Sequence, residues 1–287
     1  MNHKNPQYRN PEIPSGVQVP LFFDVQKSYV SWYDYGARFY DCQIGRWHQI
    51  DPLADEAPDW SSYNAMWCNP IFYNDPDGKW ASDFLDIEGN LITHVDDGSN
   101  AVYQLTGTDK TNEYFEFKEY NDQGGKDEVS VEGAIAGAQD YVTMNYDKCN
   151  QSVNFVGRTF KSAAEADGKT VENIDLVSKN SCARDMTANL KGKMTAESTV
   201  PKAQESSKKG NLVVGANGGH VVTMTTKALD ITRYNTSGKI TETKTIKEGR
   251  TCNVNGSPKE TNIGPGKKNS FQNPEYSGMT WYSFIAE

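Results

Sequence analysis

The chain has 287 residues, 36% hydrophobic and 23% charged, and this length suggests about one or two domains of roughly 100–200 residues each. No apolar run approaches the roughly 18 residues that a membrane-spanning helix needs, so we expect no membrane span. The first residues contain no apolar segment of the Sec type, so export, if it takes place, requires another route or a carrier.

The cysteine and histidine content argues against a metal site. Five cysteines, at positions 42, 68, 149, 182 and 252, form no CxxC pair, and their odd number leaves at least one thiol free. The four histidines show no clustered ligand spacing. We therefore expect neither a metal nor another cofactor.

The net charge of −9 hides an asymmetry between the two halves of the chain. Residues 1–147 carry 9 Lys and Arg against 25 Asp and Glu, whereas residues 148–287 carry 20 against 13, a net +7. A basic half suits an anionic polymer, either cell wall or nucleic acid, and it is equally typical of an ordinary solvated surface.

The first 80 residues divide into two stretches. Residues 1–30 are Pro-rich and predict an irregular lead-in, whereas residues 31–80 alternate aromatic residues with turn dipeptides, a pattern typical of short strands and tight turns. The second stretch contains the short sequence motifs YDYGARFYD at 33–41, GRW at 45–47, DPL at 51–53, NP at 69–70 and DPDG at 75–78.

These motifs resemble the conserved end of the Rhs (YD-repeat) core. In that family the end of the core precedes a variable C-terminal toxin, which implies that the chain beyond about residue 80 is an exchangeable effector. The resemblance also implies a pair of self-cleaving aspartates, Asp51 and Asp75, working as acid and base. Because the large YD-repeat shell is absent before them, we favour the alternative that both aspartates only form turns.

Beyond residue 80 we expect a connecting β and linker region over 81–139 and a domain of α+β class over 140–287. Small strands are predicted over 82–120 and a helix over 131–144. Further helices are predicted over 147–164, with Asp147 as the cap, over 180–192 and around Ala203. Strands are predicted at 211–215, 220–225, 228–234, 239–246 and 279–284.

Two residues of this α+β region carry the predicted chemistry. Cys149 falls in the first turn of a predicted helix, where free N–H groups and the helix dipole stabilise a thiolate. His220 follows two glycines and opens a strand, so it can serve as the base for that nucleophile. The alternatives are a buried structural cysteine and a histidine of a surface turn.

The order of the sequence motifs around these residues resembles that in papain-like peptidoglycan hydrolases. A helix with the sequence CNQSVNF starts at Cys149, a helix with ARDMTANL spans 183–190, and a hairpin segment with AQESSKKGNLVVGANGGHV spans 203–221. The resemblance implies a papain-like, amidase-type fold in which the helix-borne cysteine faces histidine on an antiparallel sheet. It further implies a third residue that orients the histidine, for which we consider Asn262 and Asp230; turn formation is the alternative for both.

Cys182 is a rival nucleophile, because its surroundings resemble the cysteine motif of another cell-wall amidase group. Only 38 residues separate it from His220, too few for the elements those amidases place between the two residues. We therefore expect Cys182 to have a packing role.

Taken together, the resemblances predict a secreted antibacterial toxin that hydrolyses amide bonds of peptidoglycan stem peptides in the periplasm of a target cell. They also imply a secretion-system carrier and a cognate immunity protein, and we expect no nucleic acid as partner. Alternatives are a papain-like protease or deamidating toxin acting on a protein, a nuclease toxin, and an inactive binding module.

Overall fold

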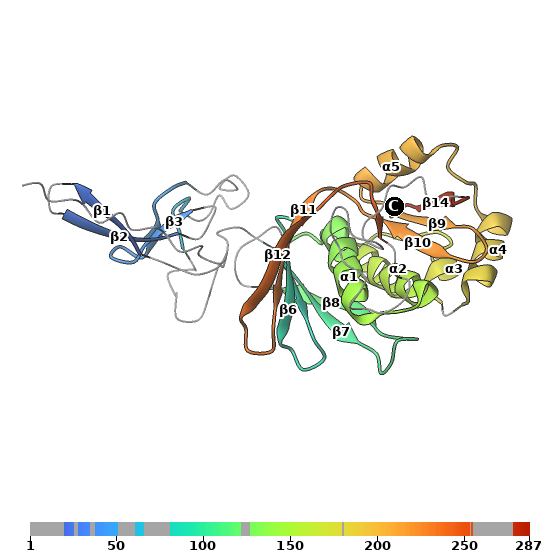
Figure 1. Cartoon of the computed structure of the whole chain (residues 1–287), viewed down its shortest axis with the longest axis horizontal. Coiled ribbons are helices and arrows are strands. Elements are labelled where there is room, and N and C mark those ends of the chain that lie inside the picture. Colours follow the sequence, from blue (N-terminus) through green and yellow to red (C-terminus); the bar gives the residue numbers. More distant parts are fainter. Residues whose placement is uncertain are drawn as a thin grey trace, which may run out of the picture. The chain divides into compact units, whose positions relative to one another are not determined.

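The computed structural model describes residues 20–25, 28–34, 38–50, 61–65, 81–121, 127–179, 181–252, 254 and 278–287 (Figure 1). The chain forms two compact units, Met1–Lys79 and Trp80–Glu287. The predicted self-cleavage residues Asp51 and Asp75 and the candidate Asn262 lie outside the described residues.

The first unit contains an antiparallel sheet with its strands in chain order. The strands are β1 Pro20–Val25, β2 Ser28–Asp34, β3 Phe39–Asp41 and β4 Arg46–Trp47. Tyr40 and Trp47 are buried and meet edge to face, with ring centroids 5.8 Å apart. The Arg38 guanidinium lies over the Trp47 ring, 4.4 Å from its centroid, which adds a cation–π contact to this small core.

The second unit is of α+β class and contains two sheets. The larger sheet has the strand order β12-β11-β6-β5-β7-β8, in which only the β5–β7 pair is parallel. Its strands are β5 Ser82–Leu85, β6 Leu91–Asp96, β7 Ala101–Thr106, β8 Tyr114–Tyr120, β11 Leu229–Tyr234 and β12 Ile240–Ile246. The predicted strands of 82–120 and the predicted hairpin of 228–246 are confirmed, and they join in one sheet.

The smaller sheet is antiparallel throughout and has the order β13-β10-β9-β14. Its strands are β9 Leu212–Ala216, β10 Val221–Met224, β13 Thr251–Cys252 and β14 Thr280–Phe284. Every residue of β9 is buried because both faces of the sheet are covered. Val214 belongs to the main hydrophobic core, whereas its neighbour Val213 packs with Ala203 and Trp281 on the other face.

In the described part of this unit five helices accompany the sheets, and four of them were predicted. They are α1 Val131–Asn145, α2 Cys149–Ala166, α3 Asp175–Ser178, α4 Ala183–Lys193 and α5 Val200–Lys208. Figure 1 shows α1 and α2 between the larger sheet and strands β9 and β10, with α5 on the far side of the smaller sheet. None of the described helices is long and apolar enough to cross a membrane.

Helix α2 runs along the edge of the larger sheet and completes its hydrogen bonding. The Thr159 and Ser162 hydroxyls of α2 accept the backbone N–H groups of Phe115 and Phe117 in β8, at 3.0 and 3.1 Å. An edge strand otherwise presents a row of unpaired backbone groups. These two bonds therefore fix α2 along its axis as well as against the sheet.

The main hydrophobic core of the second unit draws on both residues 81–139 and residues 140–287. The fully buried Phe155 of α2 packs against Phe115 of β8, with ring centroids 5.4 Å apart, and stacks on Tyr141 of α1 at 5.1 Å. Phe84 of β5 and Phe284 of β14 belong to the same core. The structure therefore places residues 81–139 and 140–287 in one compact unit rather than in a connecting region and a separate domain.

A buried ionic cluster ties α1 to the larger sheet. The carboxylate of Asp140 in α1 accepts Nε of Arg233 at 2.9 Å, Nη2 of Arg233 at 2.7 Å and Nζ of Lys244 at 2.5 Å. Burial acts to raise the pKa of the Asp140 carboxyl, but the two cations outweigh it, and the pKa lies below its ordinary value. The carboxylate is thus held ionised between the helix and strands β11 and β12.

Two helical glycines make a matched test of this packing. A Cβ at Gly137 in α1 would overlap the ring of Phe84, whereas a Cβ at Gly192 in α4 would meet nothing within 4 Å. We expect Gly137→Ala to lower the free energy of unfolding, because overpacking costs about 1–3 kcal/mol and the gain in helix propensity is only about 1 kcal/mol. Gly192→Ala should raise it by up to about 1 kcal/mol. Urea unfolding of both variants measures the effect, and a stabilised Gly137→Ala would contradict the packing described.

Candidate active site

The start of α2 presents a cysteine. Cys149 is the first residue of α2, which confirms its predicted position in the first turn of a helix, and it is half-buried. The predicted Asp147 cap is wrong: the capping position is occupied by Lys148, whose side chain makes no capping hydrogen bond. Within the first turn of α2, the Asn150 N–H donates to the Cys149 sulfur.

The turn between β9 and β10 presents a histidine. His220 directly precedes β10, which pairs with β9 in the predicted hairpin. The turn is closed by Asn217, whose backbone N–H donates to the His220 carbonyl at 3.2 Å. Its side-chain Oδ1 also accepts the backbone N–H groups of Gly219 and His220, at 3.3 and 2.9 Å.

The fold brings the cysteine and the histidine together. A hydrogen bond joins the Cys149 thiol to the His220 imidazole, and the Val221 backbone N–H also donates to the sulfur. Burial acts to raise the pKa of the Cys149 thiol, but the His220 hydrogen bond, the Val221 N–H and the imidazole charge outweigh it. The pKa therefore lies below that of an ordinary cysteine, as expected of a nucleophilic thiolate paired with an imidazolium.

Of the two proposed orienting residues, the described part of the chain contains one. Asp230 lies in β11 of the larger sheet, where it pairs with Asp96 of β6 and accepts the Thr245 hydroxyl. His220, in contrast, belongs to the hairpin of the smaller sheet. The carboxylate of Asp230 thus accepts a hydrogen bond across the β11–β12 pair, and its role as an orienting residue stays a prediction.

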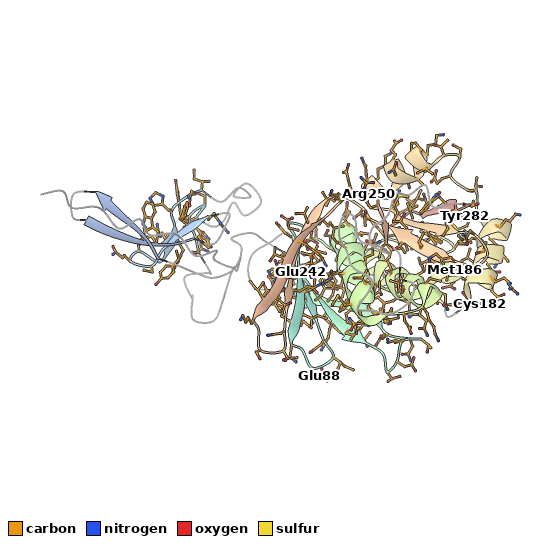
Figure 2. All side chains as sticks on the ribbon, viewed as in Figure 1. Glu88, Cys182, Met186, Glu242, Arg250 and Tyr282 are labelled. Atoms are coloured by element: carbon orange, nitrogen blue, oxygen red, sulfur yellow. The ribbon has the colours of Figure 1, made fainter. Side chains whose placement is uncertain are left out.

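The other cysteines occupy different environments. Cys182 is exposed at the start of α4, where its sulfur accepts the Asp185 N–H as the helix cap, so the predicted packing role is wrong (Figure 2). Cys252 of β13 is buried, and its burial raises the pKa of the thiol to about 12. Cys252 therefore lacks the lowered pKa that Cys149 has.

Sequence reasoning missed Asn217 and also Thr187, whose hydroxyl accepts the Gly218 N–H from the turn at 3.1 Å. The word Asn-Gly-Gly before His220 is the signal for Asn217, since asparagine followed by glycine favours a tight turn. No sequence signal connects Thr187 to a turn 31 residues later.

The chain matches no known family model, no curated protein and no solved structure in the three comparisons made. The geometry of the site therefore carries the functional argument.

Because the pKa of Cys149 is lowered, iodoacetamide should alkylate this residue fastest near neutral pH, with a midpoint below that of an ordinary cysteine. Cys252, with its raised pKa, should react slowest of the described cysteines. His220→Ala removes the largest of the effects that oppose burial, so the alkylation midpoint of Cys149 should move to higher pH. Peptide-resolved mass spectrometry follows each cysteine, and equal rates at Cys149 and Cys252 would contradict the assignment.

Proposed function

We propose that this protein is a cysteine hydrolase that cleaves amide bonds. The observation that carries the proposal is the hydrogen bond between Cys149 and His220 at the start of α2, together with the lowered pKa of the thiol. A thiolate paired with an imidazolium is suited to acyl transfer, because one group attacks the carbonyl carbon and the other protonates the leaving amine.

The reaction proceeds in two halves. The Cys149 thiolate attacks the amide carbonyl carbon, and the protonated His220 gives its proton to the amine as the C–N bond breaks, leaving a thioester on Cys149. His220, now neutral, takes a proton from water, and the resulting hydroxide attacks the thioester and releases the carboxylic acid and the thiolate. As donors for the negative charge of each tetrahedral intermediate we propose the N–H groups of the first turn of α2.

For the substrate we propose the stem peptides of peptidoglycan. The support is the resemblance of the words from Cys149 to His220 to papain-like peptidoglycan hydrolases, and the net +7 of residues 148–287. The exposed Lys148 directly precedes the nucleophile and suits a substrate that carries free carboxylates. A papain-like fold of this unit belongs to the same proposal.

For the biological role we propose an antibacterial effector that acts in the periplasm of a target cell. The support is the set of Rhs-like sequence motifs, the last of which ends at Gly78. The boundary between the two compact units follows directly, between Lys79 and Trp80. A toxin of this kind needs a secretion-system carrier to leave the producer. It also needs an immunity protein, because the producer's own wall contains the same bonds.

Purified sacculi test the chemistry directly. The wild-type protein should release soluble muropeptides with new amino and carboxyl termini, which chromatography and mass spectrometry identify. Cys149→Ala and His220→Ala should each lower the rate by about a thousandfold or more, because a reacting pair works as a unit. Cys182→Ser is the matched control: it replaces an exposed capping thiol with another good helix cap, so full activity is expected. Intact sacculi together with cleavage or deamidation of a protein substrate would move the same dyad to the protease or deamidase alternative.

Expression in two compartments tests the site of action. With an added signal peptide, the protein should cause rounding and lysis of the host, and Cys149→Ala should abolish this effect, because peptidoglycan is accessible only outside the inner membrane. Without the signal peptide it should be nearly harmless. Toxicity limited to the cytoplasmic form, with degraded DNA or RNA, would instead favour the nuclease alternative.

A further inference from the structure

The turn that carries His220 is held by side chains that take no part in the chemistry proposed above. We propose that Asn217 and Thr187 are positioning residues, which hold the β9–β10 turn so that the His220 imidazole meets the Cys149 thiol. The inference rests on the proposed function only in taking this dyad as the reacting pair.

Asn217 closes the turn from within. Its backbone N–H and its side-chain Oδ1 together make three hydrogen bonds inside a four-residue segment that ends at His220. Gly218 has a φ of +87°, a left-handed conformation that suits glycine. The shortest of the three bonds, 2.9 Å, ends on the backbone N–H of His220 and so sets the direction from which the imidazole leaves the chain.

Thr187 holds the turn from outside. Its hydroxyl donates to the Ala183 carbonyl one turn earlier in α4, at 2.7 Å, and accepts the Gly218 N–H at 3.1 Å. Because the hydroxyl donates its proton to the Ala183 carbonyl, a lone pair on its oxygen remains to accept the Gly218 N–H. The turn is thereby attached to a helix that is itself anchored in the core by the fully buried Met186 and Leu190.

The same region also holds the helix that carries the nucleophile. Asn150, the residue after Cys149, donates its side-chain Nδ2 to the carbonyl of Ser181 just before α4, at 2.9 Å. The start of α4 thus bonds to the cysteine side of the site, and Thr187 bonds to the histidine side. The Cys149–His220 hydrogen bond depends on the positions of both the start of α2 and the β9–β10 turn. Loss of either attachment to the α4 region should therefore weaken this hydrogen bond.

The test measures the pH profile of Cys149 alkylation in the full chain, peptide-resolved and without substrate. Asn217→Ala and Thr187→Val each remove the acceptor of the turn. We expect the midpoint of Cys149 alkylation to move to higher pH in both, with a rate at neutral pH that falls about tenfold for each unit by which the pKa rises. Hydrolysis of sacculi should fall in parallel.

Conservative variants and a matched turn separate positioning from stability. Asn217→Asp and Thr187→Ser keep an acceptor oxygen, so both should retain a profile close to that of the wild type. Asn235→Ala is the control: Asn235 Oδ1 accepts the N–H groups of Ser237 and Lys239 in the β11–β12 turn, both at 3.0 Å, an equivalent arrangement in another hairpin. It should cost comparable stability and leave the Cys149 profile unchanged.

The outcomes distinguish this inference from the proposed function. A shifted profile in Asn217→Ala and Thr187→Val, rescued in the conservative variants, supports positioning even if the wild type releases nothing from sacculi, in which case only the substrate is wrong. Unshifted profiles in both variants, or the same shift in Asn235→Ala, would overturn the inference even if sacculi are cleaved.

Discussion

The packing of α2 is the constraint on which the rest of the site depends. This helix lies along the edge of the larger sheet, and it also faces β10 of the smaller one. A carbonyl of the following segment approaches so closely that a Cβ at Gly157 would lie 2.7 Å from the Val177 oxygen. These contacts fix the position of α2 against both sheets and along its axis. Its first residue, Cys149, is therefore held beside the turn that precedes β10.

The reactivity of Cys149 is a balance between two opposing effects. Burial alone disfavours a thiolate, and in Cys252, where burial dominates, the pKa of the thiol rises to about 12. At Cys149 the same cost is outweighed by the imidazole and by backbone N–H groups, so the pKa falls. Half-burial serves the proposed chemistry, because it excludes much of the water that would weaken these interactions.

The larger sheet contributes to the site without supplying a residue to the dyad. It gives α1 and α2 the surface on which they pack, and the buried Asp140 cluster and the Phe155 stack connect the helices to it. Asp230 illustrates this division: it follows His220 closely in the chain, yet it lies in β11 and bonds to the neighbouring strand.

The sequence by itself predicted most of the local elements and the pairing of Cys149 with His220. The helical spacing of Val153, Val156 and Phe160 indicated α2, and the apolar segments at 211–215 and 220–225 indicated the hairpin, because local patterns report which residues each element buries. Only the tertiary structure decided how elements distant in the chain combine: the strands of 82–120 join those of 229–246 in one sheet, so that 81–139 shares a core with the rest. The link from Thr187 to Gly218 and the exposed position of Cys182 were likewise decided there. Such contacts depend on the register and packing of separate elements, and no local pattern of residues encodes them.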